Sequence, residues 1–85
     1  MDNKVLVNLF VPEISMSYDV YLPVNKKMGN IIILLNRAIS EISDGRYMVN
    51  ANNMLYNIET KVAYNPDVLL ANTDIRNGTK LLLIS

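Results

Sequence analysis

Residues 27–42, KMGNIIILLNRAISEI, determine the fold, because their apolar side chains recur at helical spacing over four turns. At about 100° per residue, positions i, i+3, i+4 and i+7 line one stripe of a helix. The stripe comprises Met28, Ile31, Ile32, Leu35, Ala38, Ile39 and Ile42. Asn36, Arg37, Ser40 and Glu41 lie opposite. We predict an amphipathic helix at about 27–42, with Asn25 as the best capping residue and Gly45 as a stop signal.

Two alternating segments precede this helix. Residues 4–11 place Val5, Val7, Leu9 and Val11 on one face, and the other face holds Lys4, Leu6, Asn8 and Phe10, which include the polar residues. Residues 16–22 alternate in the same way, and the turn at 12–15 joins the two. Alternation across a short turn is typical of a β-hairpin. Pro23 should end the second strand, because proline cannot donate a hydrogen bond to a neighbouring strand.

Shorter segments follow the helix. We predict a third strand at 46–50, a turn at 51–53 and a fourth strand at 54–56. Residues 57–74 are irregular by pattern, with a turn at Asn65-Pro66-Asp67. Residues 80–84 read Lys-Leu-Leu-Leu-Ile. A continuous apolar run suits a central, buried strand.

One helix can cover one face of a sheet made from these strands. The first and last strands are far enough apart in sequence to pair in parallel at the sheet centre. We therefore predict an α+β fold of the β-grasp type: a mixed sheet of four to five strands with one amphipathic helix packed on one face. With 85 residues, the whole of 1–85 forms a single domain.

Composition excludes several functions. The net charge is +0, which gives no basic field for nucleic acid. The sequence contains neither Cys nor His, so thiolate metal sites, disulfides and the commonest general base are absent. We expect no metal, no cofactor, no catalytic residue and no enzymatic activity. Because no signal peptide or membrane-spanning stretch is apparent, we expect a cytoplasmic protein that does not insert into the membrane.

The face of the sheet opposite the helix carries the best candidate site. If Val5, Val7, Leu81 and Leu83 point inward, their neighbours point outward. Clustered exposed apolar side chains commonly mark a partner site. We predict a partner-binding surface made of Leu6, Asn8, Phe10, Val49, Lys80, Leu82 and Ile84. Two alternatives stay open: the 57–74 segment covers part of this surface, or the surface forms a homodimer contact.

The sequence also resembles the ubiquitin-like superfamily over nearly its whole length. Apolar positions in the first strand and the helix match the superfamily's core pattern, and so does the closing segment from Leu70 through Asp74-Ile75 and Gly78 to the last strand. The matching positions are Val5, Val7, Met28, Ile31, Leu35, Met48, Leu55, Leu70, Ile75, Leu81 and Leu83. The resemblance implies that Met48 and Leu55 point inward.

Within that superfamily the chain looks most like the YukD/EsaB family of bacterial type VII (WXG100/Esx) secretion proteins. Four features carry the likeness: Val11-Pro12 at the end of the first strand, the Asp19–Pro23 second strand, the Ile31–Ile42 helix, and the Asp74–Leu81 closing segment. Conjugated ubiquitins and sulfur carriers end in Gly-Gly, whereas this sequence ends in Leu-Leu-Leu-Ile-Ser. We therefore expect no covalent conjugation.

The resemblance implies a non-catalytic accessory or regulator of a type VII secretion system. Its partner would be a protein of the secretion machine, reached from the cytoplasm or peripherally at the inner face of the membrane. Alternatives left open are a ubiquitin-like modifier or sulfur carrier, a small enzyme, and an unrelated β-grasp adaptor. A homodimer through the sheet face or an edge strand also stays open.

Overall fold

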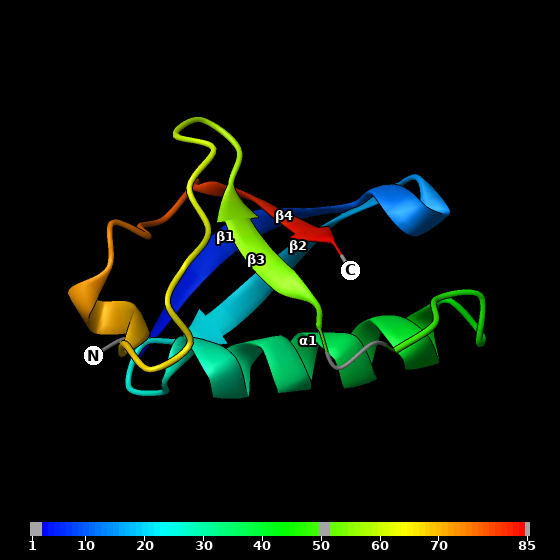
Figure 1. The fold of residues 1–85 in the computed structure, drawn as a ribbon, viewed down its shortest axis with the longest axis horizontal. Coiled ribbons are helices and arrows are strands. Elements are labelled where there is room, and N and C mark those ends of the chain that lie inside the picture. Colours follow the sequence, from blue (N-terminus) through cyan, green and yellow to red (C-terminus); the bar gives the residue numbers. More distant parts are fainter. Residues whose placement is uncertain (1–2, 50–51, 85) are drawn as a thin grey trace.

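The computed structural model describes residues 3–49 and 52–84. Within these residues, four strands and one long helix form two layers (Figure 1). The strands are β1 (Lys4–Val11), β2 (Met16–Pro23), β3 (Met54–Asn57) and β4 (Lys80–Ile84), and the helix is α1 (Met28–Ile42). Two short 3-10 helices, η1 (Pro12–Ile14) and η2 (Leu70–Asn72), lie in the connections. The predicted fold class is confirmed: this is a ubiquitin-like β-grasp.

The sheet order is β2-β1-β4-β3, so the two strands nearest the chain ends lie side by side at its centre. β1 pairs antiparallel with β2 from Lys4↔Pro23 to Val11↔Met16. β1 and β4 run parallel, with Asn8 opposite Lys80. β3 joins the far edge of β4 in antiparallel register. The mixed sheet therefore has the parallel central pair that the sequence predicted.

The core lies between α1 and one face of this sheet. Alternate strand residues point toward the helix and are buried, among them Val7, Leu9, Leu81 and Leu83. From the helix side the buried apolar side chains are Met28, Ile31, Ile32, Leu35 and Ile39. These are the inward strand positions that the alternation predicted and most of the predicted helical stripe. Ala38 and Ile42 of that stripe are exposed instead. Asn36, predicted on the opposite side, is buried where Tyr47 and Asn53 donate hydrogen bonds to its Oδ1. Burial of this apolar surface is the main force that holds the two layers together.

The start of α1 differs from the prediction. The helix begins at Met28 after Lys27, which makes no side-chain capping bond, so Asn25 is not the cap. Instead, the backbone N–H of Met28 donates to the Val68 carbonyl at 2.8 Å, and that of Gly29 donates to the Pro66 carbonyl at 2.9 Å. The free N–H groups of a first helical turn need such acceptors. A distant loop therefore caps this helix.

The strand predicted at 46–50 is wrong for residues 46–49, which form no strand; residue 50 and part of the turn predicted at 51–53 lie outside the described residues. Tyr47 N–H donates to Ser43 Oγ at 3.1 Å, and Met48 N–H donates to Glu13 Oε2 at 2.9 Å. Side-chain oxygens thus accept the backbone N–H groups that would otherwise pair with a neighbouring strand. Met48 is 71% exposed and does not point inward, whereas Tyr47 is buried.

The segment from 57 to 74 runs along the free edge of β3 and then toward the start of α1 (Figure 1). Tyr56 bridges to Ala63, and Tyr64 N–H donates to the Leu55 carbonyl at 2.9 Å. Further on, Leu70 N–H donates to the Lys26 carbonyl at 2.9 Å. These bonds tie the segment to the sheet edge and the helix start. They do not lead over the sheet face opposite α1.

Candidate functional site

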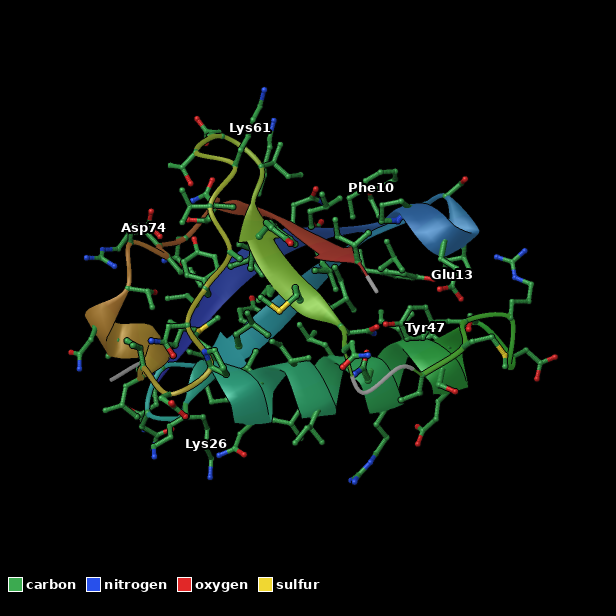
Figure 2. All side chains as sticks on the ribbon, viewed as in Figure 1. Phe10, Glu13, Lys26, Tyr47, Lys61 and Asp74 are labelled. Atoms are coloured by element: carbon green, nitrogen blue, oxygen red, sulfur yellow. The ribbon has the colours of Figure 1, made fainter. Side chains whose placement is uncertain are left out.

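The face of the sheet opposite α1, here called the outer face, presents every second residue of each strand. Its inward neighbours are buried, which fixes the direction of the alternation. β1 contributes Leu6, Asn8 and Phe10, and β4 contributes Lys80, Leu82 and Ile84. β2 adds Ser17, Asp19 and Tyr21, and β3 adds Met54 and Tyr56. In Figure 2, Phe10 is labelled on the side of the sheet away from α1.

Apolar side chains form a continuous patch on this face. Phe10 lies opposite Leu82 across the parallel pair, and Leu82 lies opposite Tyr56 across the antiparallel pair. The next row places Ile84 opposite Met54. We call these five residues the apolar patch. Directly opposed side chains on neighbouring strands lie about 5 Å apart, which brings Phe10, Leu82 and Tyr56 together in one row and Ile84 and Met54 together in the next.

A polar row borders the patch toward the other end of the sheet. It runs across three strands as Asp19, Asn8 and Lys80, which are paired in register. Asn8 Nδ2 donates a hydrogen bond to Asp19 Oδ1 at 3.2 Å. Within residues 3–49 and 52–84, Lys80 forms no ion pair. The outer face therefore combines an apolar surface with one uncompensated positive charge beside it.

Six of the seven predicted site residues share the outer face: Leu6, Asn8, Phe10, Lys80, Leu82 and Ile84. Val49 does not join them, and this placement in the prediction is wrong. Val49 is 59% exposed and lies in the segment between α1 and β3, where it lines a groove against the helix. The error follows from the wrongly predicted strand at 46–49. Because Val49 does not belong to a strand, alternation does not place its side chain on either face of the sheet.

The site prediction omitted Tyr56, Met54 and Tyr21. The signal for them was present in the sequence. Leu55 was assigned an inward direction, so its neighbours Met54 and Tyr56 had to point outward. The alternation of residues 16–22 likewise placed Tyr21 opposite the core side. The outer face is therefore wider than predicted, and it extends over both edge strands.

A second surface feature is the groove beside Val49, between α1, β3 and the 64–66 segment. Its volume is about 980 Å³, and exposed Ile33 of α1 is among its lining residues. Met54, at the start of the edge strand β3, borders both this groove and the outer face. A buried polar cluster borders it: Tyr47 Oη donates to Asn36 Oδ1 at 2.6 Å, and Asn53 Nδ2 donates to both oxygens. Among the described residues, Asn53 Oδ1 has no hydrogen-bond partner and is inaccessible to solvent. This cluster joins the post-helix segment to α1.

Two tyrosines have a raised pKa, and in both cases the cause is burial and neighbouring side chains of the fold. Burial raises the pKa of Tyr64 to about 12, and the hydrogen bond that its Oη donates to Asp74 Oδ1 at 2.7 Å adds to this. Burial also raises the pKa of Tyr47, with a further contribution from the Glu13 carboxylate, which lies near it in Figure 2. Both hydroxyl groups therefore stay protonated at neutral pH. Neither side chain belongs to the outer face.

The described residues contain no group of three or more Asp, Glu, His or Cys side chains placed to hold a metal ion. Among the same residues, no helix combines the length and the hydropathy needed to cross a bilayer.

Comparison with known proteins supports the fold assignment. No protein-family model and no curated sequence matches the chain. Among solved structures, the chain is similar to the ubiquitin-like domain of the type VII secretion protein EccD1 from Mycobacterium tuberculosis, with a TM-score of 0.74, 16% identity and full coverage of both chains. It is also similar to the EccD5 ubiquitin-like domain from Mycobacterium xenopi, with a TM-score of 0.77, 15% identity, and coverage of 98% of this chain and 94% of that one.

A third similar structure is a chain of the MycP5-free ESX-5 inner membrane complex, with a TM-score of 0.72 and 15% identity. The match covers 98% of this chain but only 21% of that protein. At these identities the three likenesses establish a shared ubiquitin-like fold. A shared fold does not by itself assign a function.

Proposed function

We propose that this chain is a non-catalytic ubiquitin-like module that docks onto a protein of a type VII secretion machine through its outer face. The observation that carries the proposal is the apolar patch, which spans β1, β4 and β3 on the outer face, with Met54 and Ile84 exposed and Phe10, Tyr56 and Leu82 half-buried. Clustered exposed apolar side chains of this kind mark protein contact sites.

Affinity would come from burial of the apolar patch, and the polar row would set the orientation of the partner. The two central strands carry most of the patch, so its side chains are held by backbone pairing on both sides. Such a preformed surface loses little conformational freedom on binding. The geometry therefore suits docking through a rigid, preformed surface better than docking through a segment that becomes ordered on binding.

The link to secretion rests on the fold neighbours. Two of them are ubiquitin-like domains of EccD proteins, and one is a chain of an ESX-5 inner membrane complex. The sequence resemblance to the YukD/EsaB family points in the same direction. We infer that this chain acts as a cytoplasmic accessory or regulator that meets the machine peripherally, through a protein subunit. The sequence lacks His and Cys, which supports a role without catalysis.

Affinity capture from the producing organism, followed by mass spectrometry, tests this proposal. Ile84 is 37% exposed at the margin of the patch, so Ile84→Asp should leave the fold intact while placing a charge in the interface. The matched control is Ile33→Asp, because Ile33 is 57% exposed on α1, away from the outer face. We expect wild type and Ile33→Asp to capture a secretion-machine subunit and Ile84→Asp to lose it. Equal capture by all three folded proteins would refute the proposal.

A further inference from the structure

The central strand β4 presents a basic residue and two aliphatic residues in line on the outer face. Lys80, Leu82 and Ile84 alternate with the buried Leu81 and Leu83. Residues two apart on a strand lie about 7 Å from each other. On the outer face, β4 therefore carries one positive charge followed by two apolar side chains at equal spacing.

In the part of the chain that the structure describes, no acidic side chain forms an ion pair with Lys80. Among the described residues, Asp19 is the acidic side chain that the strands place on this face, and it lies on β2, two strands away from β4. Two strand spacings amount to about 10 Å. The Asp19 carboxylate already accepts a hydrogen bond from Asn8, which stands between it and Lys80. The exposed ammonium group of Lys80 is therefore available to an outside partner.

The same row restricts where a partner's carboxylate can be placed. Over β2, Asp19 would repel it, whereas over β4 it would meet Lys80 beside the apolar patch. Lys4, the other basic residue of the outer face, lies opposite Pro23 at the far end of the β1–β2 pair. Lys80 is followed on its own strand by two outward apolar residues, Leu82 and Ile84, whereas Lys4 is followed by Leu6 and then by the polar Asn8.

We propose that the docking segment of the partner is a peptide with one Asp or Glu next to two apolar residues, the carboxylate pairing with Lys80 and the apolar residues packing on Leu82 and Ile84. This inference rests on the proposed function and specifies the partner's chemistry at the same surface. An ion pair at the margin of an apolar contact is partly shielded from water, which strengthens it and fixes register.

A selection from a display library of random dodecamer peptides, made against the whole wild-type protein, tests this inference. We expect peptides that bind wild type and Ile33→Asp but not Ile84→Asp to be enriched in Asp or Glu beside aliphatic or aromatic residues. For these peptides, Lys80→Met, which keeps the apolar stem, should weaken binding about tenfold. Lys80→Glu should weaken it further, and exchange of the peptide's acid for Lys should restore binding to Lys80→Glu.

The outcomes separate the two proposals. If Ile84-dependent peptides show no acidic preference and bind Lys80→Glu as well as wild type, the inference about the partner's charge is overturned while the docking surface stands. If no selected peptide loses binding on Ile84→Asp, the outer face is not a docking surface, and both proposals fall. Salt provides a further check, because the affinity of an acidic peptide should fall with ionic strength for wild type and much less for Lys80→Met.

Discussion

At the scale of single residues, Tyr64 illustrates how a long irregular connection is fixed. Its hydroxyl group donates to Asp74 Oδ1 and accepts a hydrogen bond from Asn57 Nδ2 at 3.0 Å. Asn57 belongs to β3, and Asp74 precedes β4, so one side chain joins both ends of the 57–74 segment. These side-chain hydrogen bonds add to the backbone hydrogen bonds and the buried Leu70 side chain that also anchor this segment.

Replacement of Tyr64 by Phe should lower the free energy of unfolding at pH 7 by about 1 kcal/mol, because it removes these hydrogen bonds and leaves their partners unpaired. Urea unfolding followed by circular dichroism measures the change. The matched control is Tyr21→Phe, since Tyr21 is 67% exposed and makes no hydrogen bond through its hydroxyl within the described residues. A loss as large in Tyr21→Phe as in Tyr64→Phe would contradict the assigned role.

The raised pKa of Tyr64 also predicts a pH dependence. An unfolded tyrosine loses its proton near pH 10, whereas folded Tyr64 retains it to about pH 12. Unfolding in this window releases a proton, so stability contributed by Tyr64 is complete below pH 10 and declines as pH rises toward 12. Tyr64→Phe should therefore flatten the alkaline fall of stability, with Tyr47 responsible for part of the remaining slope. If the free energy of unfolding fell as steeply with pH in Tyr64→Phe as in wild type between pH 9 and about 11.5, this assignment would be contradicted.

At the scale of elements, the start of α1 depends on a loop far away in sequence. The carbonyls of Pro66 and Val68 accept from the first N–H groups of the helix. A β-carbon added at Gly29 would lie 3.2 Å from both the Pro66 Cβ and the Pro66 carbonyl oxygen. The absence of a side chain at position 29 thus lets the capping loop approach closely.

Gly29→Ala should consequently lower the free energy of unfolding, although alanine is about 1 kcal/mol better than glycine inside a helix. The added methyl group pushes Pro66 away from the helix start and weakens the cap. Asn30→Ala is the control, because Asn30 is exposed on the next helical position and should gain stability from the same propensity. The midpoint of thermal unfolding, measured for both variants, shows whether the steric effect at position 29 outweighs the gain in helix propensity. If Gly29→Ala stabilised the protein as much as Asn30→Ala does, the close approach of Pro66 to position 29 would be shown to be unimportant.

The same scale shows what the sequence could predict. Periodicity predicted α1, β1 and β2, because apolar burial on one face leaves a period that survives in the sequence, whereas a continuous apolar run predicted β4. Residues 46–49 have suitable residue types for a strand, but the backbone N–H groups of Tyr47 and Met48 donate to the Ser43 and Glu13 side chains instead of to a neighbouring strand. The helix cap was missed for a related reason. Its acceptors are backbone carbonyls from a remote loop, which have no signature in the side chains near Lys27.

At the scale of the whole molecule, one face of the sheet is buried against the helix, and the other is the face that we propose for partner binding. The helix covers the inner face, and the 57–74 segment takes the edge of β3 (Figure 1). The outer face was predictable because alternation assigns every second residue to one side of a sheet. Val49 was misplaced because its position depends on the local path after α1, which alternation does not encode.

The outer face, and not the helix side, is the surface proposed to meet a protein partner. Photo-crosslinking in the producing organism can distinguish the two surfaces, with a photoreactive amino acid placed at Phe10 in one variant and at Ile33 in another. We expect a crosslinked adduct with a secretion-machine subunit from position 10 and none from position 33. An adduct from position 33 with none from position 10, both proteins being folded and equally expressed, would contradict the proposed docking surface.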